Sequence, residues 1–179
     1  MELMLFEVST QRLLLKPISM AYKTEIFREF TREVSTYLYS EPAEKIQYTE
    51  KFINQSLLKI EKGEELIIVI LKKDSQEFLG CTGIHQIHSK YPQFGIWLKK
   101  SAHKSGYATE TITALKSWAD QNLNYEYIQY SVDEANTPSR RVAEKLGGKI
   151  ARKYDHITLS AKVLNIVEYR IIKHQNSDF

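Results

Sequence analysis

The sequence is poor in cysteine, with Cys81 the single one among 179 residues. A lone cysteine excludes an internal disulfide and a cysteine-rich metal site, and it fits a chain that works in a reducing cytosol. Because Cys81 lies in an apolar stretch typical of a strand, we expect it to be a small buried side chain. We therefore expect neither a disulfide nor a bound metal.

Long apolar runs and a strong charge bias are also missing. No apolar stretch approaches the roughly 20 residues that span a bilayer, and the start of the chain, MELMLFEVSTQR, carries no cleavable signal pattern. The 25 Lys and Arg residues against 22 Asp and Glu residues give a net charge of +3, scattered along the chain. Nucleic-acid-binding domains usually carry a dominant basic surface. We expect a cytoplasmic protein that binds neither a membrane nor a nucleic acid.

Internal repeats, low-complexity runs and interdomain linkers are absent as well. A chain of 179 residues, with 42% hydrophobic and 26% charged residues, has the composition of an ordinary globular protein with one core. We expect a single domain over residues 1–179, in which the polar residues 173–179 form a frayed tail.

The first third of the chain predicts one strand and two helices. Residues 13–15 read as a strand that Pro17 ends. Apolar positions at helical spacing then predict an amphipathic helix over 22–38. A second helix is predicted to begin at Ser40-Glu41-Pro42, with the proline in its first turn, and to end at Gly63.

The middle of the chain predicts an antiparallel meander. Residues 66–71 are continuously apolar, so both faces of this strand should be buried. Strands over 78–87 and 94–98 follow after short polar turns. Within the former, Gly80 and Gly83 predict a bulge or a close neighbour.

The last third predicts strands alternating with helices. A helix over 106–120 separates the strand at 94–98 from one at 125–132, so these two strands should be parallel neighbours. Thr137 is predicted to cap another helix, with Pro138 in its first turn, and Gly147-Gly148 ends that helix. Strands near 150–157 and 164–172 complete a mixed α+β fold.

One loop has the features of an anion site. The basic loop 99–105 leads directly into the helix that begins near Gly106, where the first N–H groups have no intrahelical acceptor. A glycine there allows the backbone to approach a ligand closely. Positive charge converges on the same turn, as a phosphate or diphosphate requires; its source is Lys99, Lys100, His103 and Lys104.

This loop resembles the acetyl-coenzyme A signature of the GNAT N-acetyltransferases, with the RimJ/RimL group as the most similar branch. The segment His103-Lys104-Ser105-Gly106-Tyr107-Ala108-Thr109-Glu110 carries the resemblance, preceded by Gly95-Ile96-Trp97-Leu98. His103 stands where the family usually has Gln or Arg, and Lys104 stands in place of the first Gly. The resemblance implies a mostly antiparallel twisted sheet of about six or seven strands with a parallel central pair, flanked by about four helices. It also implies that acetyl-coenzyme A is bound as co-substrate by residues 96–98 and 103–109, and that the first two helices form the acceptor-substrate wall.

A second segment, DEANTPSRRVAEKLGG over 133–148, resembles the family's later strand-to-helix junction. The resemblance implies that Asn136 binds the pantetheine arm, and that the Ser139 hydroxyl lies near the sulfur and protonates the departing thiolate. Asn and Ser at a helix start are also ordinary capping residues. Arg140 and Arg141 are candidates for additional charge toward the phosphates.

The resemblance defines three chemical tasks. A backbone donor must stabilise the thioester oxygen, and a bulge implied within 96–98 would free such groups. Ser139 would protonate the sulfur, with Tyr107 or Tyr130 as alternatives. The attacking amine must be neutral, yet the family's usual Glu position holds Gln93, so the base is either a water chain or another residue, with His85 and His88 as candidates. This departure favours an α-amine over a lysine side chain as the acceptor, because an α-amine loses its proton more readily.

Two hypotheses follow, and the identity of the acceptor is left open. The first is an enzyme that acetylates a primary amine, either a protein N-terminus or a small molecule. The second is a non-catalytic acetyl-coenzyme A-binding module on the same fold, to which the departures at Lys104 and Gln93 point. A P-loop nucleotide hydrolase fits poorly, because no Gly-Lys-Ser/Thr ends the loop. The oligomeric state also stays open, with a homodimer as one candidate.

Overall fold

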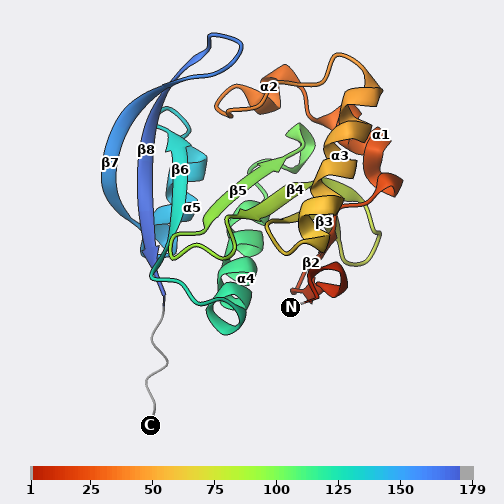
Figure 1. The fold of residues 1–179 in the computed structure, drawn as a ribbon. Coiled ribbons are helices and arrows are strands. Elements are labelled where there is room, and N and C mark those ends of the chain that lie inside the picture. The colour runs from red at the N-terminus through yellow and green to blue at the C-terminus, as the bar shows by residue number, and fades with distance from the viewer. Residues whose placement is uncertain (1, 174–179) are drawn as a thin grey trace.

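The computed structural model describes residues 2–173, which form eight strands in one sheet (Figure 1). The strand order is β1-β2-β3-β4-β5-β6-β8-β7, and β5 and β6 are the parallel pair within an otherwise antiparallel sheet. The predicted mixed α+β fold and its parallel pair are confirmed, with slightly more strands than expected. The strands are β1 (Val8–Ser9), β2 (Leu13–Pro17), β3 (Leu66–Lys72), β4 (Phe78–His85), β5 (Gln93–Leu98), β6 (Tyr127–Asp133), β7 (Lys149–Ile157) and β8 (Val163–Ile172).

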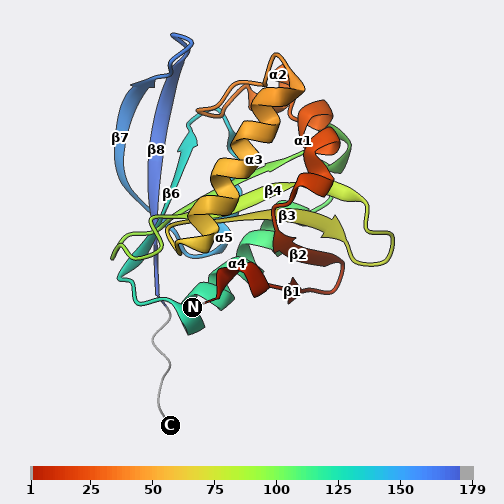
Figure 2. The ribbon, with the colours of Figure 1, turned by 45° about the vertical axis from the view of Figure 1, so that its right-hand side comes forward.

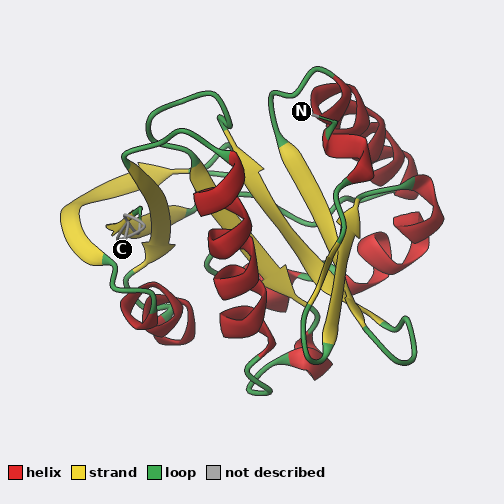
Figure 3. Cartoon of the chain, turned by 90° about the horizontal axis from the view of Figure 1, so that it is seen from below, coloured by secondary structure: helices red, strands yellow, loops and turns green. Residues whose placement is uncertain are grey.

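Helices cover both faces of the central strands, which explains the continuously apolar sequence of β3. Helices α1 and α3 lie against one face, while α4 and α5 lie on the other (Figures 2 and 3). Every residue of β3 except its last is buried. In the described chain the α-helices are α1 (Lys23–Glu29), α2 (Arg32–Ser35), α3 (Ile46–Glu61), α4 (Tyr107–Asn122) and α5 (Thr137–Lys145).

The single helix predicted over 22–38 is wrong, because the chain breaks it into α1 and α2. Phe30 leaves the helical region with φ −82° and ψ 75°, and its ring packs on Trp97 with centroids 4.9 Å apart. The Thr31 hydroxyl then caps α2 by accepting a hydrogen bond from the Val34 N–H at 3.3 Å. A side chain that caps a new helix and an aromatic ring that packs on Trp97 together outweigh the continuous helical pattern.

The second helix begins later than its proline suggests. Helix α3 starts at Ile46, so Pro42 lies in the preceding loop and not in a first helical turn. The Glu41 carboxylate beside it is bound by Lys162 at 2.8 Å and by Ser160 at 3.1 Å. These contacts hold the loop against the turn between β7 and β8, which a local sequence pattern does not reveal. The predicted end of the helix before Gly63 is confirmed.

Gly80 in β4 has the close neighbour that its position in a strand predicts. Its φ is +157°, and a Cβ there would lie 2.1 Å from the carbonyl oxygen of Trp97 on β5. The register of β3 against β4 also shifts between Ile70 and Leu71, beside this glycine. Only a residue without a side chain allows β4 and β5 to approach this closely.

The bulge expected within 96–98 is absent from the ladder that β5 forms with β4. The pairing runs without a shift from His85 opposite Gln93 to Gly80 opposite Leu98. The opening lies on the other side of β5, where the parallel pairing with β6 covers Gln93 and Phe94 alone in the described chain. Beyond Phe94 the two strands diverge, because β5 stays with β4 while β6 continues along β8.

The end of the described chain is tied to the domain. The Lys173 Nζ donates a hydrogen bond to the Leu123 carbonyl at 2.7 Å, and the remainder of the expected frayed tail, 174–179, lies outside the described residues. Across residues 2–173 no helix combines the length and the apolar character that crossing a membrane requires.

Candidate active site

Free backbone amides line the turn that begins α4. From Lys104 to Thr109, no N–H group donates to an acceptor within the described residues, and the first bond of the helix is Glu110 N–H to the Gly106 carbonyl at 3.1 Å. Gly106 is the N-cap residue, with φ +79°. The turn therefore presents consecutive donors at the positive end of a 16-residue helix.

Lys104 occupies a left-handed conformation, with φ +60°. Glycine adopts this conformation without a penalty, whereas a side chain at Cβ costs roughly 1–2 kcal/mol. The turn thus keeps the backbone path of a glycine at a position where this sequence has lysine. The neighbouring contacts have to supply the stabilisation.

Arg12, the residue immediately before β2, supplies that stabilisation. The sequence alone did not indicate this role. The Arg12 Nη1 donates to the Ser105 carbonyl at 3.0 Å, and its Nη2 lies 2.7 Å from the Glu110 carboxylate. Its guanidinium also stacks over the Tyr107 ring at 4.6 Å from the centroid. Glu110 accepts a further hydrogen bond from the Thr10 hydroxyl at 2.6 Å. The Thr-Glu pair of the signature was the available signal, because a carboxylate in the first turn of a helix needs a partner.

The lysines around the turn do not all face it. Lys99 pairs with Glu77 at 2.7 Å, and Lys100 pairs with Glu33 at 2.5 Å. Hydrogen bonds from Lys72 and then Lys99 lower the pKa of the Glu77 carboxyl to about 2. For Lys104, the described chain places no carboxylate within ion-pair distance, so it is the cation left for an anionic ligand. Of the four basic side chains expected to converge on the turn, Lys104 is thus the one lysine without a carboxylate partner in the described chain.

The diverging strands expose a second set of backbone groups. The Gln129 N–H donates to the Pro92 carbonyl at 2.9 Å, so Pro92 faces β6. Because backbone groups alternate in direction along a strand, Ile96 and Leu98 also face β6, where the described chain has no pairing partner for them. His103 Nε2 lies 2.9 Å from the Leu98 carbonyl. Ile96 thus keeps its N–H on the open side.

Trp97 differs from its two neighbours on β5. Its backbone groups face β4, where it is paired with Cys81. Its ring packs against Phe30 and Phe78, with centroids 4.9 and 5.8 Å away. The structure therefore separates the predicted trio 96–98 into open-side residues and one packing residue.

Ser139 lies near the point after Phe94 where β5 and β6 diverge, which we call the fork. Its hydroxyl is hydrogen-bonded to that of Tyr130. Their hydroxyl oxygens are 3.0 Å apart, and burial raises the pKa of Tyr130 to about 12, which keeps it protonated. Asn136 caps α5 by accepting from the Ser139 N–H at 3.3 Å, so the cap is Asn136 and not Thr137 as expected. The Asx side chain reaches the helix amides because its own backbone lies outside the helical region.

Two other predicted residues lie apart from the fork. Tyr107 stacks under Arg12 and does not line the cavity at Ser139. Arg140 donates to the Tyr169 hydroxyl at 3.0 Å and to the Glu134 carbonyl at 3.3 Å. The Arg140 guanidinium is therefore bound to neighbouring groups of the protein.

The two candidate bases differ in position. His85 Nδ1 lies 3.3 Å from Glu65 Oε2, while His85 Nε2 lies over the facing glycines Gly83 and Gly95. His88 Nε2 lies near Gly63 instead, at the far side of the loop after β4. Gln93 donates to the Gln129 side chain at 2.7 Å, so this amide joins the parallel strands.

Two cavities meet at this point of the sheet. One of about 330 Å³ lies at the fork and is lined by Tyr130, Asn136 and Ser139. The other, of about 570 Å³, lies between the sheet and the segment that runs from α1 to α3. Five residues line both, and they are Leu38, Tyr39, His85, Gly95 and Ile96. Ile96 and His85 therefore stand where a molecule in one cavity meets a molecule in the other.

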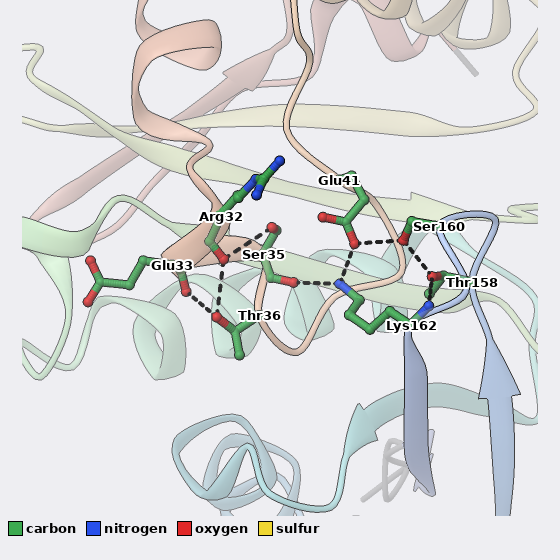
Figure 4. Close-up of polar contacts among 8 residues, drawn as sticks. All are labelled: Arg32, Glu33, Ser35, Thr36, Glu41, Thr158, Ser160 and Lys162. Atoms are coloured by element: carbon green, nitrogen blue, oxygen red, sulfur yellow. Dashed lines mark hydrogen bonds and ion pairs between the residues drawn. The ribbon is translucent and has the colours of Figure 1, made fainter.

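Polar contacts join the turn between β7 and β8 to the segment around Ser35 and Glu41 (Figure 4). Lys162 donates to the Ser35 carbonyl at 3.0 Å and pairs with the Glu41 carboxylate. Its hydrogen bond, the largest favourable influence, lowers the pKa of Glu41. Residues more than a hundred positions apart are thus held together, and Glu41 among them lines the second cavity.

The described residues contain no cluster of typical metal ligands. Across residues 2–173 no group of three or more His, Cys, Asp or Glu side chains is arranged to hold a metal ion. Cys81 is fully buried in β4, and its burial raises the pKa of the thiol.

Comparison with known proteins adds a family to this geometry. A family model described as the acetyltransferase (GNAT) domain matches residues 12–149. A search by sequence among curated proteins finds no match. The matched region runs from Arg12 through the α4 turn and α5 to the first residue of β7.

Solved structures share the fold across almost the whole chain. The chain is similar to RimL, the ribosomal L7/L12 alpha-N-protein acetyltransferase in complex with coenzyme A, with a TM-score of 0.83 and 15% identity over 93% of this chain and 98% of that one. It is similar to spermidine N-acetyltransferase from Vibrio cholerae in complex with CoA and spermine, with a TM-score of 0.79 and 17% identity over 92% and 97%. A GNAT-family acetyltransferase from Bacillus anthracis gives a TM-score of 0.80 and 18% identity over 95% and 100%. At such identities these structures establish the fold alone.

Proposed function

The chain belongs to the GNAT acetyltransferase family, and we propose that it transfers the acetyl group of acetyl-coenzyme A directly to a primary amine. The observation that carries the proposal is the row of free amides from Lys104 to Thr109 beside the fork between β5 and β6. A diphosphate needs such a row of donors, and an extended pantetheine arm needs an unpaired strand edge. The chain has both features: the open edge of β5 follows Phe94, and the free amides begin at Lys104, shortly after the end of this strand.

The residues present fit coenzyme A as the co-substrate. The amides of 104–109 and the Lys104 ammonium would hold the diphosphate, and Arg12 would keep the turn open by holding the Ser105 carbonyl away from it. The pantetheine arm would lie along the open side of β5, where Ile96 and Leu98 offer backbone groups. Two structural relatives were solved with coenzyme A, which supports this assignment.

The acetyl carbonyl would then meet the Ile96 N–H. In the transfer, the amine nitrogen forms a bond to the carbonyl carbon while negative charge develops on the oxygen, which a fixed N–H stabilises. The bond from carbon to sulfur then breaks. The Ser139 hydroxyl is in position to pass a proton to the departing thiolate, with Tyr130 hydrogen-bonded behind it.

His85 is the base that this arrangement favours over His88. It lines both cavities, whereas His88 lines neither, and Glu65 lies beside its Nδ1, so that Nε2 is turned toward the acceptor side. The proton that leaves the amine would go to Nε2. This replaces the carboxylate that the Gln93 position lacks.

The acceptor we propose is an α-amine. With a pKa near 8, roughly a tenth of such amines are neutral at pH 7, whereas a lysine amine of pKa about 10.4 is neutral about once in 2,500. A single histidine suffices for the former. RimL is described as acting on a protein α-amine and the Vibrio enzyme as a spermidine acetyltransferase, and the RimJ/RimL-like branch is the one that the proposal favours.

The test is release of free thiol from acetyl-coenzyme A in the presence of α-amines, compared with the rate without an amine. Turnover that depends on the amine supports the proposal. Tight binding of coenzyme A, measured by calorimetry, with no turnover above hydrolysis on any amine would instead indicate a binding module. Failure to bind coenzyme A at all would contradict both.

A further inference from the structure

The larger cavity, of about 570 Å³, is the place where the proposed acceptor would bind. Its size is within the roughly 300–1,000 Å³ typical of small-molecule sites. It shares His85, Gly95 and Ile96 with the cavity at the fork, so an occupant can reach the acetyl group. If the amino group of an acceptor lies at these shared residues, the rest of the acceptor molecule contacts the walls of the larger cavity.

Several aromatic side chains from separate segments line this cavity. Helix α1 and its end contribute Phe27 and Phe30, β5 contributes Trp97, and α3 contributes Tyr48 and Phe52. The last two are 56% and 44% exposed, although each has a large apolar ring. Exposed aromatic rings at the mouth of a cavity gain free energy when an apolar ligand removes them from water.

Negative charge is scarce in the same cavity. In the described chain the lining carboxylates are those of Glu41 and Glu44. Glu41 is already neutralised, because Lys162 pairs with it at 2.8 Å and Ser160 donates to it (Figure 4). One unpaired carboxylate cannot match a polyamine, which carries several positive charges along its length.

We propose that the acceptor of this enzyme is an α-amine attached to a large apolar or aromatic side chain, bound with that side chain against Phe27, Phe30 and Phe52. This rests on the proposed function, since it assigns the second substrate of the same site. The occupant is a peptide N-terminus or an amino-acid amide with such a side chain, not a polyamine. Phe52 acts as a specificity-determining residue at the mouth.

Equilibrium binding tests this without requiring turnover. Phenylalaninamide, leucinamide and glycinamide carry the same α-amine and differ in their side chains, and spermidine supplies the polycation. We expect calorimetry on the full chain saturated with coenzyme A to give phenylalaninamide about a tenfold or greater advantage over glycinamide. Phe52→Ala should remove most of that advantage and leave glycinamide unaffected.

Leu58→Ala is the matched control, because Leu58 is a 55% exposed apolar residue of the same helix that does not line the cavity. It should leave both affinities unchanged. Equal affinities for the three amides, or tighter binding of spermidine at moderate salt, would overturn the inference. Thiol release on the same panel reports separately on the proposed function: turnover without side-chain preference contradicts the inference alone, and selective binding without turnover contradicts the transfer alone.

Discussion

His85 Nδ1 lies 3.3 Å from Glu65 Oε2, and Lys59 Nζ lies 2.9 Å from the other oxygen of the same carboxylate. Glu65, just before β3, thus links Lys59 near the end of α3 to His85, the last residue of β4. A carboxylate on one ring nitrogen fixes which nitrogen is left for chemistry. Here Nε2 is left, and it lies over Gly83 and Gly95 where the cavities meet.

The first prediction concerns Glu65. Glu65→Gln should lower kcat by roughly tenfold at pH 7, because the imidazole loses the carboxylate that orients it. The loss should shrink as pH rises past the pKa of the acceptor amine, where no base is needed. The pH profile of kcat for phenylalaninamide measures this.

Glu64→Gln is the control, as Glu64 precedes Glu65 and its side chain is exposed. It should leave the profile unchanged. If Glu65→Gln reduces kcat by the same factor at every pH, the carboxylate has only a structural role.

The second prediction concerns the turn before α4. Gly106→Val should weaken coenzyme A binding by at least tenfold, because it forces a branched side chain into a backbone conformation with φ +79° among the free amides. It should also destabilise the fold by about 1–3 kcal/mol. Calorimetric titration with coenzyme A measures the first effect, and urea unfolding measures the second.

Gly147→Val separates the two effects. Gly147 has a similar φ of +76° and lies at the end of α5 with open space around it. It should cost similar stability and leave coenzyme A affinity unchanged. Full affinity in Gly106→Val would show that the diphosphate is bound elsewhere.

The third prediction concerns the hydroxyl pair at the fork. Ser139→Ala should lower kcat by about a hundredfold, because the thiolate loses its proton source, with little effect on coenzyme A binding. The cap on α5 is preserved, since Asn136 accepts from the backbone of Ser139 and not from its side chain. Single-turnover kinetics measure the chemical step.

Tyr130→Phe tests whether the two hydroxyls act together. Because their oxygens are 3.0 Å apart, the double variant should lose no more than the more damaged single variant. Fully additive losses would indicate two independent roles.

The fourth prediction concerns pH and the Arg12 clamp. Burial raises the pKa of Glu110, but hydrogen bonds from Thr10 and Arg12 outweigh it, so the net pKa is lowered below its ordinary value of 4.5. A lowered folded-state pKa stabilises the fold above the unfolded pKa, and this stabilisation is lost as the pH falls through the folded pKa. Glu110→Gln should therefore cost about 1 kcal/mol at pH 7. The difference from the native chain should vanish well below pH 4.5, as urea unfolding at several pH values would measure. A constant difference at all pH values would contradict the ionic role.

Local sequence was sufficient where a single segment decides its own conformation. The α4 turn is an example, because a basic loop, a glycine and an amphipathic run are contiguous, and the structure has the helix beginning at Tyr107. The buried strand β3 is another, since continuous apolar residues bounded by polar turns have few alternatives. Asn136 and Ser139 were singled out by the resemblance of residues 133–148 to the family's strand-to-helix junction, while local sequence indicated only a helix cap, which the structure has at Asn136.

Residues joined across the chain were not predictable in this way. Arg12 is 98 positions from Glu110, and Lys162 lies on a turn that meets Glu41 only in the folded molecule. Glu65 gave no signal, because an exposed-looking glutamate after a helix is common. The break at Phe30 likewise depends on Trp97, which pulls the ring out of the helical path.

The sequence alone thus determined the order of the elements, the turn before α4 and the residues of the late helix, because hydrophobic period and turn chemistry act over a few neighbouring residues. The tertiary structure decided how β5 and β6 separate, which nitrogen of His85 is free and what lines the larger cavity. Those features depend on which distant segments pack together, and packing is set by the whole core rather than by any one stretch.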